Sequence, residues 1–532
     1  MKRRSFLQSV PVTIGGMTVT AHASSPLLAA LNASLLDTDR VLVVIQLSGG
    51  NDGLNTVIPL DQYSALALPT IRERILIPED KVLILSGTQD ATGLHPAMTG
   101  MHELFEAGKM AIIQGVGYEK FNYSHFRATD IMMTGADSTE FLYSGWLGRY
   151  LAYEFPNYPV GFPNQDMPDP LGIRVGGNVV LGLQNQSVPM AISISNTNDP
   201  LNLTGSLFAD PAPQNYLGKE LSYIREVQRQ TDKFGDSVKG AADKGTNLSQ
   251  RYPIQNQPGY TLGQQLKIVA KLISGGIKTR IFWLSTGGYD THSNQVADTD
   301  HSTGNHANLL KGLSDCVGAF MDDVKLLGAE DRVMGMVFSE FGRRIVSNAS
   351  RGTDHGAAQP MFVFGSKVIG GTVMGNNPVI DPQSKVNSNL PMQYDYRSVY
   401  ATILGDWFCV PEADLEDILL RNYQKLPILD PTNCIPTSVH DRNEKLGDNI
   451  VYAYPNPFVD RTRIKFEVFG GHALLQIINN EGSVIRVLHD GELPAGKYDI
   501  DCDLVQEPAG IYYVRLQNGP LQQVKNMMKV RG

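Results

Sequence analysis

Residues Arg332–Gly356 read RVMGMVFSEFGRRIVSNASRGTDHG, an apolar run that ends in a polar, glycine-rich stretch. The run Arg332–Phe338 is typical of a buried strand, and Glu340, Asp354 and His355 follow it. In open α/β sheets, ligands bind outside the carboxyl ends of the strands. We therefore predict a polar site at the C-terminal edge of a sheet.

Two other segments of the chain have the same sequence pattern. Val41–Asn55 (VLVVIQLSGGNDGLN) and Ile281–Asn294 (IFWLSTGGYDTHSN) are apolar runs followed by glycines and an Asp. These runs, like Met110–Gln114 and Met361–Phe364, lack strict alternation, which favours a largely parallel sheet buried on both faces. The amphipathic stretch Tyr260–Ser274 predicts a helix between strands. Together these patterns indicate an α/β fold with one composite polar site.

The composition is that of a folded, mildly acidic protein. The chain has 532 residues, of which 42% are hydrophobic and 19% charged, so we expect globular domains and more than one of them. A formal net charge of -9 argues against a general nucleic-acid binder, and we predict no nucleic-acid partner. The four cysteines form no CxxC pair, which argues against a cysteine zinc site; a Cys409–Cys434 disulfide stays open.

The N-terminus has the layout of an export signal. It reads MKRRSFLQSVPVTIGGMTVTAHASS, with a positive segment, a mildly apolar Val10–Thr20 stretch and small residues after it. The paired arginines before SFL resemble a twin-arginine signal, which implies the twin-arginine translocase as a partner. We assign residues 1–32 to this signal region; a disordered basic tail is the alternative. The apolar stretch is too short for a permanent transmembrane helix, which needs about 20 residues.

The C-terminal region changes character after a polar linker, residues 441–450. From residue 451 to residue 532, short alternating segments such as Thr462–Val468 and Ile511–Leu516 are separated by turns, which predicts a small β-sandwich. The strings YPNPF, NNEGSVIRVL, PAGKYDIDCDL and PAGIYYVRL, in this order, resemble the type A C-terminal sorting domain of type IX secretion. A carbohydrate-binding or adhesive sandwich is the alternative.

That resemblance has consequences for partners and location. It implies the type IX secretion machinery as a partner, passage through the periplasm, and a final place at the cell surface or outside the cell. No permanent transmembrane segment is predicted.

Carboxylates and imidazoles after the strand-like runs are ordinary ligands for divalent metals such as zinc, manganese or calcium. The candidate metal ligands are Asp52, Asp290, His292, Glu340, Asp354 and His355. His301 and His306 could supply further imidazoles. The alternatives are an Asx-type turn for Asp52, a structural ion-pair cluster around Glu340, and plain loop polarity for the histidines.

The segment after Met110–Gln114 supplies a candidate nucleophile, Ser124, which a metal or a base could activate. A helix N-cap is the alternative role for Ser124. Arginine binds anions through two parallel hydrogen bonds, which suits an anionic ester substrate. The candidate substrate-binding residues are Arg127, Arg343 and Arg344. Arg127 could instead pair with Asp130.

Several strings in order along the chain resemble the domain-of-unknown-function family 1501, whose members are typically exported. They are LSGGNDGLN, GLHPAM, SHFRATD, GWLGRYL, GGYDTHSNQ, SEFGRR and GTDHG. The resemblance implies an alkaline-phosphatase-like three-layer α/β/α core, related to the alkaline phosphatase and sulfatase superfamily, over residues 33–440. By position, it makes Asp52 the first metal ligand, Ser124 the nucleophile and His355 the last imidazole. Phe341 stands where that superfamily usually has a His.

These observations lead to a functional prediction. We expect an exported, metal-dependent hydrolase of phosphate or sulfate esters. The alternative is a non-catalytic secreted protein that keeps the fold for ligand binding or surface assembly. The polar stretch Gly205–Gln257, with a charged helix expected over Leu217–Gly235, is interpreted as a cap or insertion.

Overall fold

The computed structural model describes most of the chain. It describes residues 40–197 and 233–430, except 156, 157, 160 and 187, and it describes Cys434. In the C-terminal part it describes residues 451–529, except 455, 457, 469, 481, 519 and 520. Near the N-terminus it describes the short strands β1 (Pro11–Ile14) and β2 (Met17–Thr20). Most of the predicted signal region, the linker 441–450 and residues 217–232 of the expected charged helix lie outside these residues; residues 233–244 are helical. The chain divides into two compact units, residues 33–435 and residues 436–532 with 1–32.

A nine-stranded sheet forms the centre of the larger unit. Its order is β11 (Ile192–Ile194), β8 (Gly172–Val175), β12 (Ile281–Thr286), β3 (Val41–Leu47), β13 (Val333–Ser339), β16 (Gln359–Gly365), β7 (Met110–Gly117) and β17 (Thr372–Met374), with β18 (Tyr394–Asp395) beside β7. Neighbouring strands are parallel except at β16, which runs antiparallel to both β13 and β7. The predicted α/β class with a mostly parallel sheet is thus confirmed.

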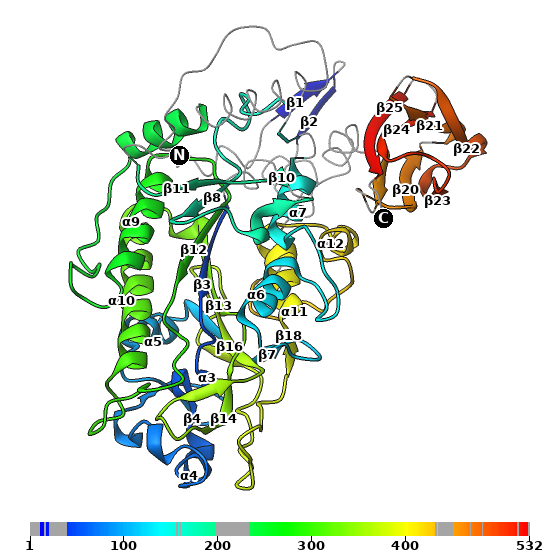
Figure 1. Ribbon diagram of the computed structural model, residues 1–532. Coiled ribbons are helices and arrows are strands. Elements are labelled where there is room, and N and C mark those ends of the chain that lie inside the picture. Colours follow the sequence, from blue (N-terminus) through cyan, green and yellow to red (C-terminus); the bar gives the residue numbers. More distant parts are fainter. Residues whose placement is uncertain are drawn as a thin grey trace, which may run out of the picture. The chain divides into compact units, whose positions relative to one another are not determined.

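Helices cover both faces of this sheet (Figure 1). One face carries α5 (Thr99–Glu106), α9 (Tyr260–Ser274) and α10 (Asn305–Leu326), and the other carries α6 (His125–Thr134), α7 (Trp146–Glu154), α11 (Tyr396–Thr402) and α12 (Glu412–Leu419). A π-helical turn, Ile403–Trp407, continues α11.

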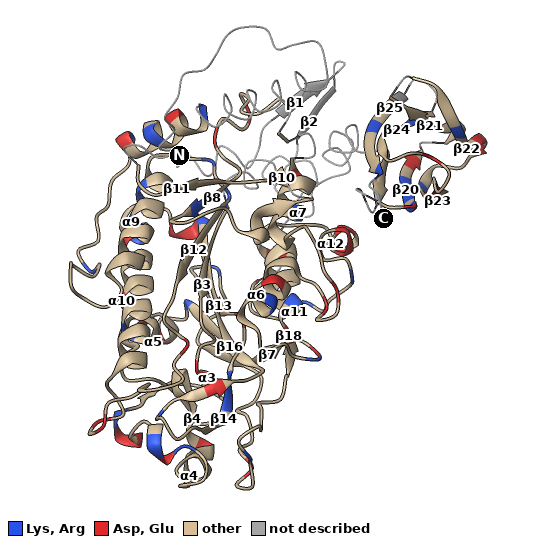
Figure 2. Ribbon diagram, in the orientation of Figure 1, with Lys and Arg blue, Asp and Glu red and all other residues tan. Residues whose placement is uncertain are grey.

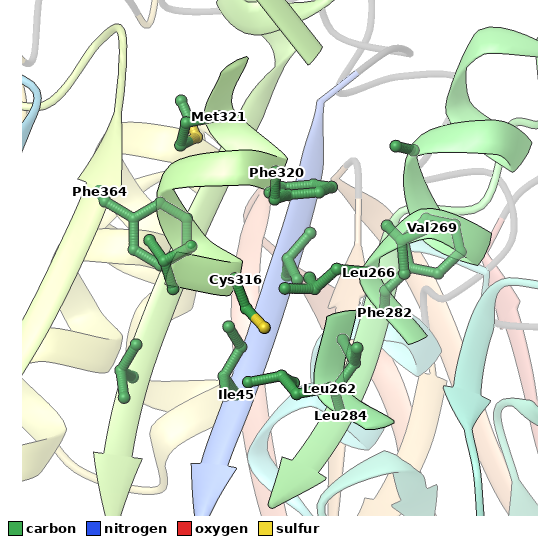
Figure 3. Packing of buried hydrophobic residues seen from close by; sticks show 14 of the residues in the cluster. Ile45, Leu262, Leu266, Val269, Phe282, Leu284, Cys316, Phe320, Met321 and Phe364 are labelled. Carbon is green, nitrogen blue, oxygen red and sulfur yellow. The ribbon is translucent and has the colours of Figure 1, made fainter. Parts of the chain in front are cut away.

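Strand β3 is apolar at every position except Gln46. Successive side chains of a strand point to opposite faces, so both of its faces need apolar residues when both are covered. Ile45 belongs to the same core cluster as Leu266 of α9 and Phe320 of α10, and Figure 3 shows all three. Its neighbour Val44 belongs to the second cluster, with Trp146 of α7.

Shorter elements surround the main sheet. They are the small sheet β4 (Val57–Pro59), β5 (Leu83–Ile84) and β6 (Thr92–Leu94), the pair β9 (Gln184–Asn185) and β10 (Val188–Pro189), the hairpin β14 (Arg343–Ser347) and β15 (Thr353–His355), the short helices α3 (Gly53–Thr56) and α4 (Tyr63–Leu66), and the 3-10 turns Leu60–Gln62, Glu73–Ile75, Glu79–Lys81, Leu181–Leu183 and Glu330–Arg332. Acidic and basic residues are interspersed along the ribbon (Figure 2).

The C-terminal unit is all-β, as predicted. Its strands are β19 (Val451–Tyr454), β20 (Arg461–Val468), β21 (Gly471–Asn479), β22 (Val484–Leu493), β23 (Gly496–Asp503), β24 (Gly510–Asn518) and β25 (Leu521–Lys529), in two antiparallel sheets. Phe466 of β20 and Leu475 of β21, from different sheets, share one buried cluster. This common core is what makes the two sheets a sandwich.

None of the helices in the described part of the chain combines the length and apolar character needed to cross a membrane.

Cys409 and Cys434 form a disulfide across a sequence separation of 25 residues. Replacing both by Ser is expected to lower the free energy of unfolding by about 3 kcal/mol, because the cross-link restricts the unfolded chain. Urea unfolding with and without reductant measures this loss. Cys316 and Cys502 are free and buried, and burial raises the pKa of Cys316 to about 12 and that of Cys502 to about 11. Their thiols therefore stay protonated, so a reductant should change stability only through the Cys409–Cys434 disulfide. An unchanged unfolding midpoint in the double variant would contradict the prediction.

Candidate metal centre

The candidate site lies where several strands of the main sheet end together. In the register of the parallel strands, Leu47 of β3 is the partner of both Thr286 of β12 and Ser339 of β13. Strand β7 points the same way, because β16 is antiparallel both to it and to β13. The polar residues that follow these four strands therefore meet at one edge, as the sequence predicts.

Three of these four strand ends contribute an acidic or imidazole side chain to the candidate site. Asp290 and His292 follow β12, Glu340 follows β13 directly, and His125 begins helix α6 after β7. The hairpin β14–β15 adds His355, whose backbone pairs with that of Arg343.

Two glycines allow the strands to come this close. Gly49 has a φ of 127°, and a Cβ there would lie 2.3 Å from the backbone nitrogen of Asp290. Gly50 has a φ of 74°, and its Cβ would lie 2.3 Å from the ring of Phe341. Both conformations favour glycine, so the sequence Gly49-Gly50 is required by backbone shape and by space.

The imidazoles of His125, His292 and His355 surround the carboxylate of Asp290. The Nε2 atoms of His292 and His355 lie 3.1 Å and 3.2 Å from Oδ1 of Asp290, and Nε2 of His125 lies 3.5 Å from Oδ2. Ligand atoms of His125, Asp290 and His355 all lie within 4.8 Å of one another. We call these four residues the His/Asp cluster.

The second ring nitrogen of each histidine faces an acceptor. Nδ1 of His125 lies 2.8 Å from Oε1 of Glu340, and Nδ1 of His292 lies 3.1 Å from Oδ1 of Asp354. Nδ1 of His355 lies 2.8 Å from the carbonyl oxygen of Tyr123.

These acceptors determine the tautomers. Because each Nδ1–H donates a hydrogen bond, the neutral ring carries its lone pair on Nε2, toward the cluster. Nε2 of His292 and Nε2 of His355 are 2.9 Å apart, and two facing lone pairs repel unless a proton or a cation lies between them. Histidines that ligate metals usually donate their other nitrogen to a carboxylate or a carbonyl in this way.

Arg343 keeps Asp290 ionised. Its fully buried guanidinium donates to Oδ1 of Asp290 at 2.6 Å and also to the carbonyls of Gly50 and Thr353. Burial alone would raise the pKa of Asp290, but the hydrogen bond and charge of Arg343 outweigh it and lower that pKa to about 2. Burial lowers the pKa of His355, which favours its neutral form.

Phe341, where the resembled superfamily usually has a His, supports two of the imidazoles. Its ring centroid lies 5.0 Å from that of His125 and 4.7 Å from that of His355. The Phe341 side chain thus packs beside both imidazoles and has no donor atom of its own.

Asp52 has its partners elsewhere. It accepts hydrogen bonds from Arg72 at 2.8 Å and 2.9 Å and from Gln295 at 2.6 Å, and both Asp52 and Arg72 are buried. Burial by itself would raise the pKa of Asp52, but the Arg72 charge and hydrogen bonds lower it overall. In this structure Asp52 belongs to an internal ion pair rather than to the His/Asp cluster.

The other candidate residues lie at the rim. Ser124 is the exposed N-cap residue of α6, next to His125, and its side chain makes no capping hydrogen bond. Arg127 donates to the carbonyls of Asp137, Ser138 and Glu140 and lies 4.0 Å from the ring of Phe141.

Arg344 also has protein partners. It donates to the carbonyl oxygens of His355 and Val386, at 3.0 Å and 3.1 Å, and to Asn387. Arg127 and Arg344 therefore position loops in this structure.

The sequence predicts no metal-ligand role for one member of the cluster, His125. It offers the preceding residue, Ser124, as the candidate nucleophile. The available signal was a histidine at the expected start of a helix that follows a strand-like run.

Two further histidines are buried next to Asp52. Nε2 of His306 lies 2.9 Å from Oδ1 of Asn51, and the His306 ring lies 6.1 Å from that of His95. Burial is the main cause that lowers the pKa of His306 to about 4 and that of His95 to about 3. His301, by contrast, faces the carbonyl of Leu76.

Stability is expected to fall as the pH is lowered from about 6.5 toward 4. The unfolded chain takes up protons near the ordinary histidine pKa of 6.5, whereas folded His306 stays neutral down to about 4. Since the unfolded state binds more protons in this window, stability rises with pH there, by ~1.4 kcal/mol per unit for each such histidine.

Urea unfolding at about pH 7 and about pH 5 measures this dependence. The variant His306→Gln should show a shallower loss than the wild type, while the exposed control His472→Gln should keep the wild-type slope. Equal slopes in all three proteins would show that His306 is not held neutral in the folded state.

Two segments of the chain match known families. Residues 225–419 match the family described as "Protein of unknown function (DUF1501)", and residues 452–530 match the "Secretion system C-terminal sorting domain". Both resemblances predicted from the sequence are thereby confirmed, although the motifs before residue 225 lie outside the first match. The sorting domain points to export and to a place at the cell surface or outside the cell.

Solved structures of the predicted superfamily match with low scores. A protein in the alkaline phosphatase superfamily from Vibrio parahaemolyticus has 10% identity and a TM-score of 0.28, covering 85% of this chain and 82% of its own. A phosphonate monoester hydrolase from Silicibacter pomeroyi has 11% identity and a TM-score of 0.32, covering 92% and 88%. The PsFucS1 sulfatase from Pseudoalteromonas sp. has 10% identity and a TM-score of 0.33, covering 91% and 87%.

No curated protein matches the sequence.

Proposed function

We propose that this protein is an exported, metal-dependent hydrolase of phosphate or sulfate esters, with the His/Asp cluster as its metal site. The observation that carries the proposal is the convergence of the Nε2 atoms of His125, His292 and His355 on Asp290. The ester class comes from the family resemblance, whose match over residues 225–419 includes three of the four cluster residues.

The donor set fits a borderline divalent cation. Three imidazole nitrogens and one carboxylate suit zinc or manganese better than calcium, which prefers oxygen ligands. Of the two Asp290 oxygens, Oδ1 accepts from Arg343, whereas Oδ2 faces Nε2 of His125 and does not. A cation held there would polarise an ester and lower the pKa of a bound water.

Neighbouring side chains of the protein would orient the cluster residues and balance their charge. Glu340 and Asp354 fix the rings of His125 and His292, and buried Arg343 fixes Asp290. Ser124, one residue from His125 and exposed, stays the candidate nucleophile. It would act once substrate and cation lower the cost of its ionisation.

Metal removal tests the proposal. The purified chain, stripped with a chelator, is expected to lose hydrolysis of p-nitrophenyl phosphate or p-nitrophenyl sulfate and to regain it with zinc or manganese. The physical reason is that the carboxylate of Asp290 alone repels an anionic ester. If neither ester is hydrolysed with any divalent cation, the alternative of a binding or surface-assembly protein is favoured. Hydrolysis that survives chelation would contradict the metal assignment.

A further inference from the structure

A pocket of about 630 Å³ lies directly beside the His/Asp cluster. It is formed where strand β12 ends and where helices α9 and α10 begin, and Asp290 belongs both to its wall and to the cluster. The size falls within the range of small-molecule sites, about 300–1,000 Å³.

The pocket wall is rich in neutral hydrogen-bonding groups. Among the residues that line it, Asn256, Gln257, Asn305 and Asn308 carry side-chain amides, and Thr286 and Ser293 carry hydroxyls. Each of these groups can both donate and accept a hydrogen bond. A ligand that carries several hydroxyls, which also donate and accept, matches such a wall.

Much of this capacity is available to a ligand. Within the parts of the chain that the structure describes, the side chains of Asn256, Asn308 and Thr286 have no hydrogen-bond partner in the protein. Gln257 uses only its oxygen, which accepts from the backbone of Ile254, and Asn305 uses only its amide nitrogen, which donates to Asn294.

Charge and apolar surface narrow the ligand class. The residues that line the pocket include no Lys or Arg, and their one ionisable carboxylate is Asp290, so a phosphate or sulfate group is not favoured within the pocket itself. Half-buried Leu309 and the exposed Tyr260 add apolar surface. A sugar ring has both an apolar C–H face and a hydroxyl rim, which fits this mixture.

We propose that this pocket binds a neutral, polyhydroxylated ring, that is, a sugar unit. The inference deepens the proposed function and rests on it in one respect: the sugar would be the alcohol part of the ester presented to the cluster. Sugar binding itself requires no turnover, so the two proposals can fail separately.

Saturation-transfer NMR on the full chain tests the pocket. The probes are the neutral trisaccharides cellotriose, maltotriose and β-1,4-galactotriose, with the tripeptide Gly-Ser-Gly as a competing class. At least one trisaccharide is expected to receive saturation from the wild type and from His125→Ala, which lacks a cluster imidazole but leaves the pocket intact.

Pocket variants provide the decisive comparison. Asn308→Trp places a large ring in the pocket from an exposed helix position and should abolish the sugar signal. Asn422→Trp, the same change at an exposed site outside the pocket, should leave the signal unchanged. If Asn308→Trp does not fold, the double change Gln257→Ala/Asn308→Ala is expected to weaken the signal at least tenfold.

Three results would overturn the proposal: no trisaccharide signal with the wild type, a signal that survives in Asn308→Trp, or saturation of the tripeptide alone. Sugar binding without ester hydrolysis would leave the pocket assignment standing and remove the proposed reaction.

Discussion

Replacing His125 by Ala is expected to abolish ester turnover by the protein while the chain stays folded. His125 is one of the three histidines whose Nε2 faces Asp290, so its removal takes away a ligand of the proposed cation. Its side chain is 33% exposed, so its removal opens a space at the surface rather than a closed cavity in the core. The measurements are initial rates on the ester that the wild type hydrolyses and the urea unfolding midpoint.

Two control variants sharpen that prediction. Glu340→Gln keeps His125 in place but weakens the acceptor on its Nδ1, and should lower cation affinity about 10- to 100-fold without abolishing it. His102→Ala removes an imidazole of similar exposure from helix α5, outside the His/Asp cluster, and should leave turnover unchanged. Wild-type turnover in His125→Ala, or equal losses in both His→Ala variants, would contradict the role given to His125.

Replacing Asp52 by Ala is expected to destabilise the fold by about 3–5 kcal/mol, because it leaves the buried Arg72 charge without its carboxylate. Arg72 is fully buried, and the carboxylate of Asp52 takes two of its hydrogen bonds, at 2.8 Å and 2.9 Å. Urea unfolding measures the loss. The double variant Asp52→Ala/Arg72→Met should be less unstable than the sum of the single changes, since it removes both charges.

Asp52 also separates two interpretations of the site. The family resemblance makes it the first metal ligand, whereas in the structure its oxygens bind Arg72 and Gln295. A folded Asp52→Asn variant should therefore retain bound cation. A loss of cation with no loss of stability would instead support the ligand role.

Local patterns in the sequence were sufficient for most of the fold. Val41–Leu47 is predictable as a buried strand because six of its seven residues are apolar, and Tyr260–Ser274 is predictable as a helix from its 3.6-residue periodicity. The short strand Gly172–Val175, which contains a buried Arg174, carries no such signal. The antiparallel direction of β16 depends on how the chain returns to the sheet, which no local pattern contains.

The sequence predicts where the site lies in the fold, but not which role each of its residues has. Because the carboxyl ends of parallel strands meet at one edge of a sheet, the sequence predicts that Asp290 and His355 lie close together. In the structure, Nε2 of His355 lies 3.2 Å from Oδ1 of Asp290. Asp52 sits in the same kind of motif, yet its partner Arg72 lies 20 residues away and cannot be recognised from spacing. For the same reason, sequence does not distinguish a carboxylate that binds a cation from one that, like Glu340, orients an imidazole.

The most direct test of the central claim, that the His/Asp cluster holds a divalent cation, is elemental analysis by inductively coupled plasma mass spectrometry. The full chain would be stripped, incubated with zinc or manganese and desalted, as wild type, as Asp290→Ala and as Asp298→Ala, which removes a more exposed aspartate nearby. The structure predicts near-stoichiometric metal in the wild type and in Asp298→Ala, and none in Asp290→Ala. Equal metal in all three proteins, or no metal in the wild type with either ion, would contradict the claim.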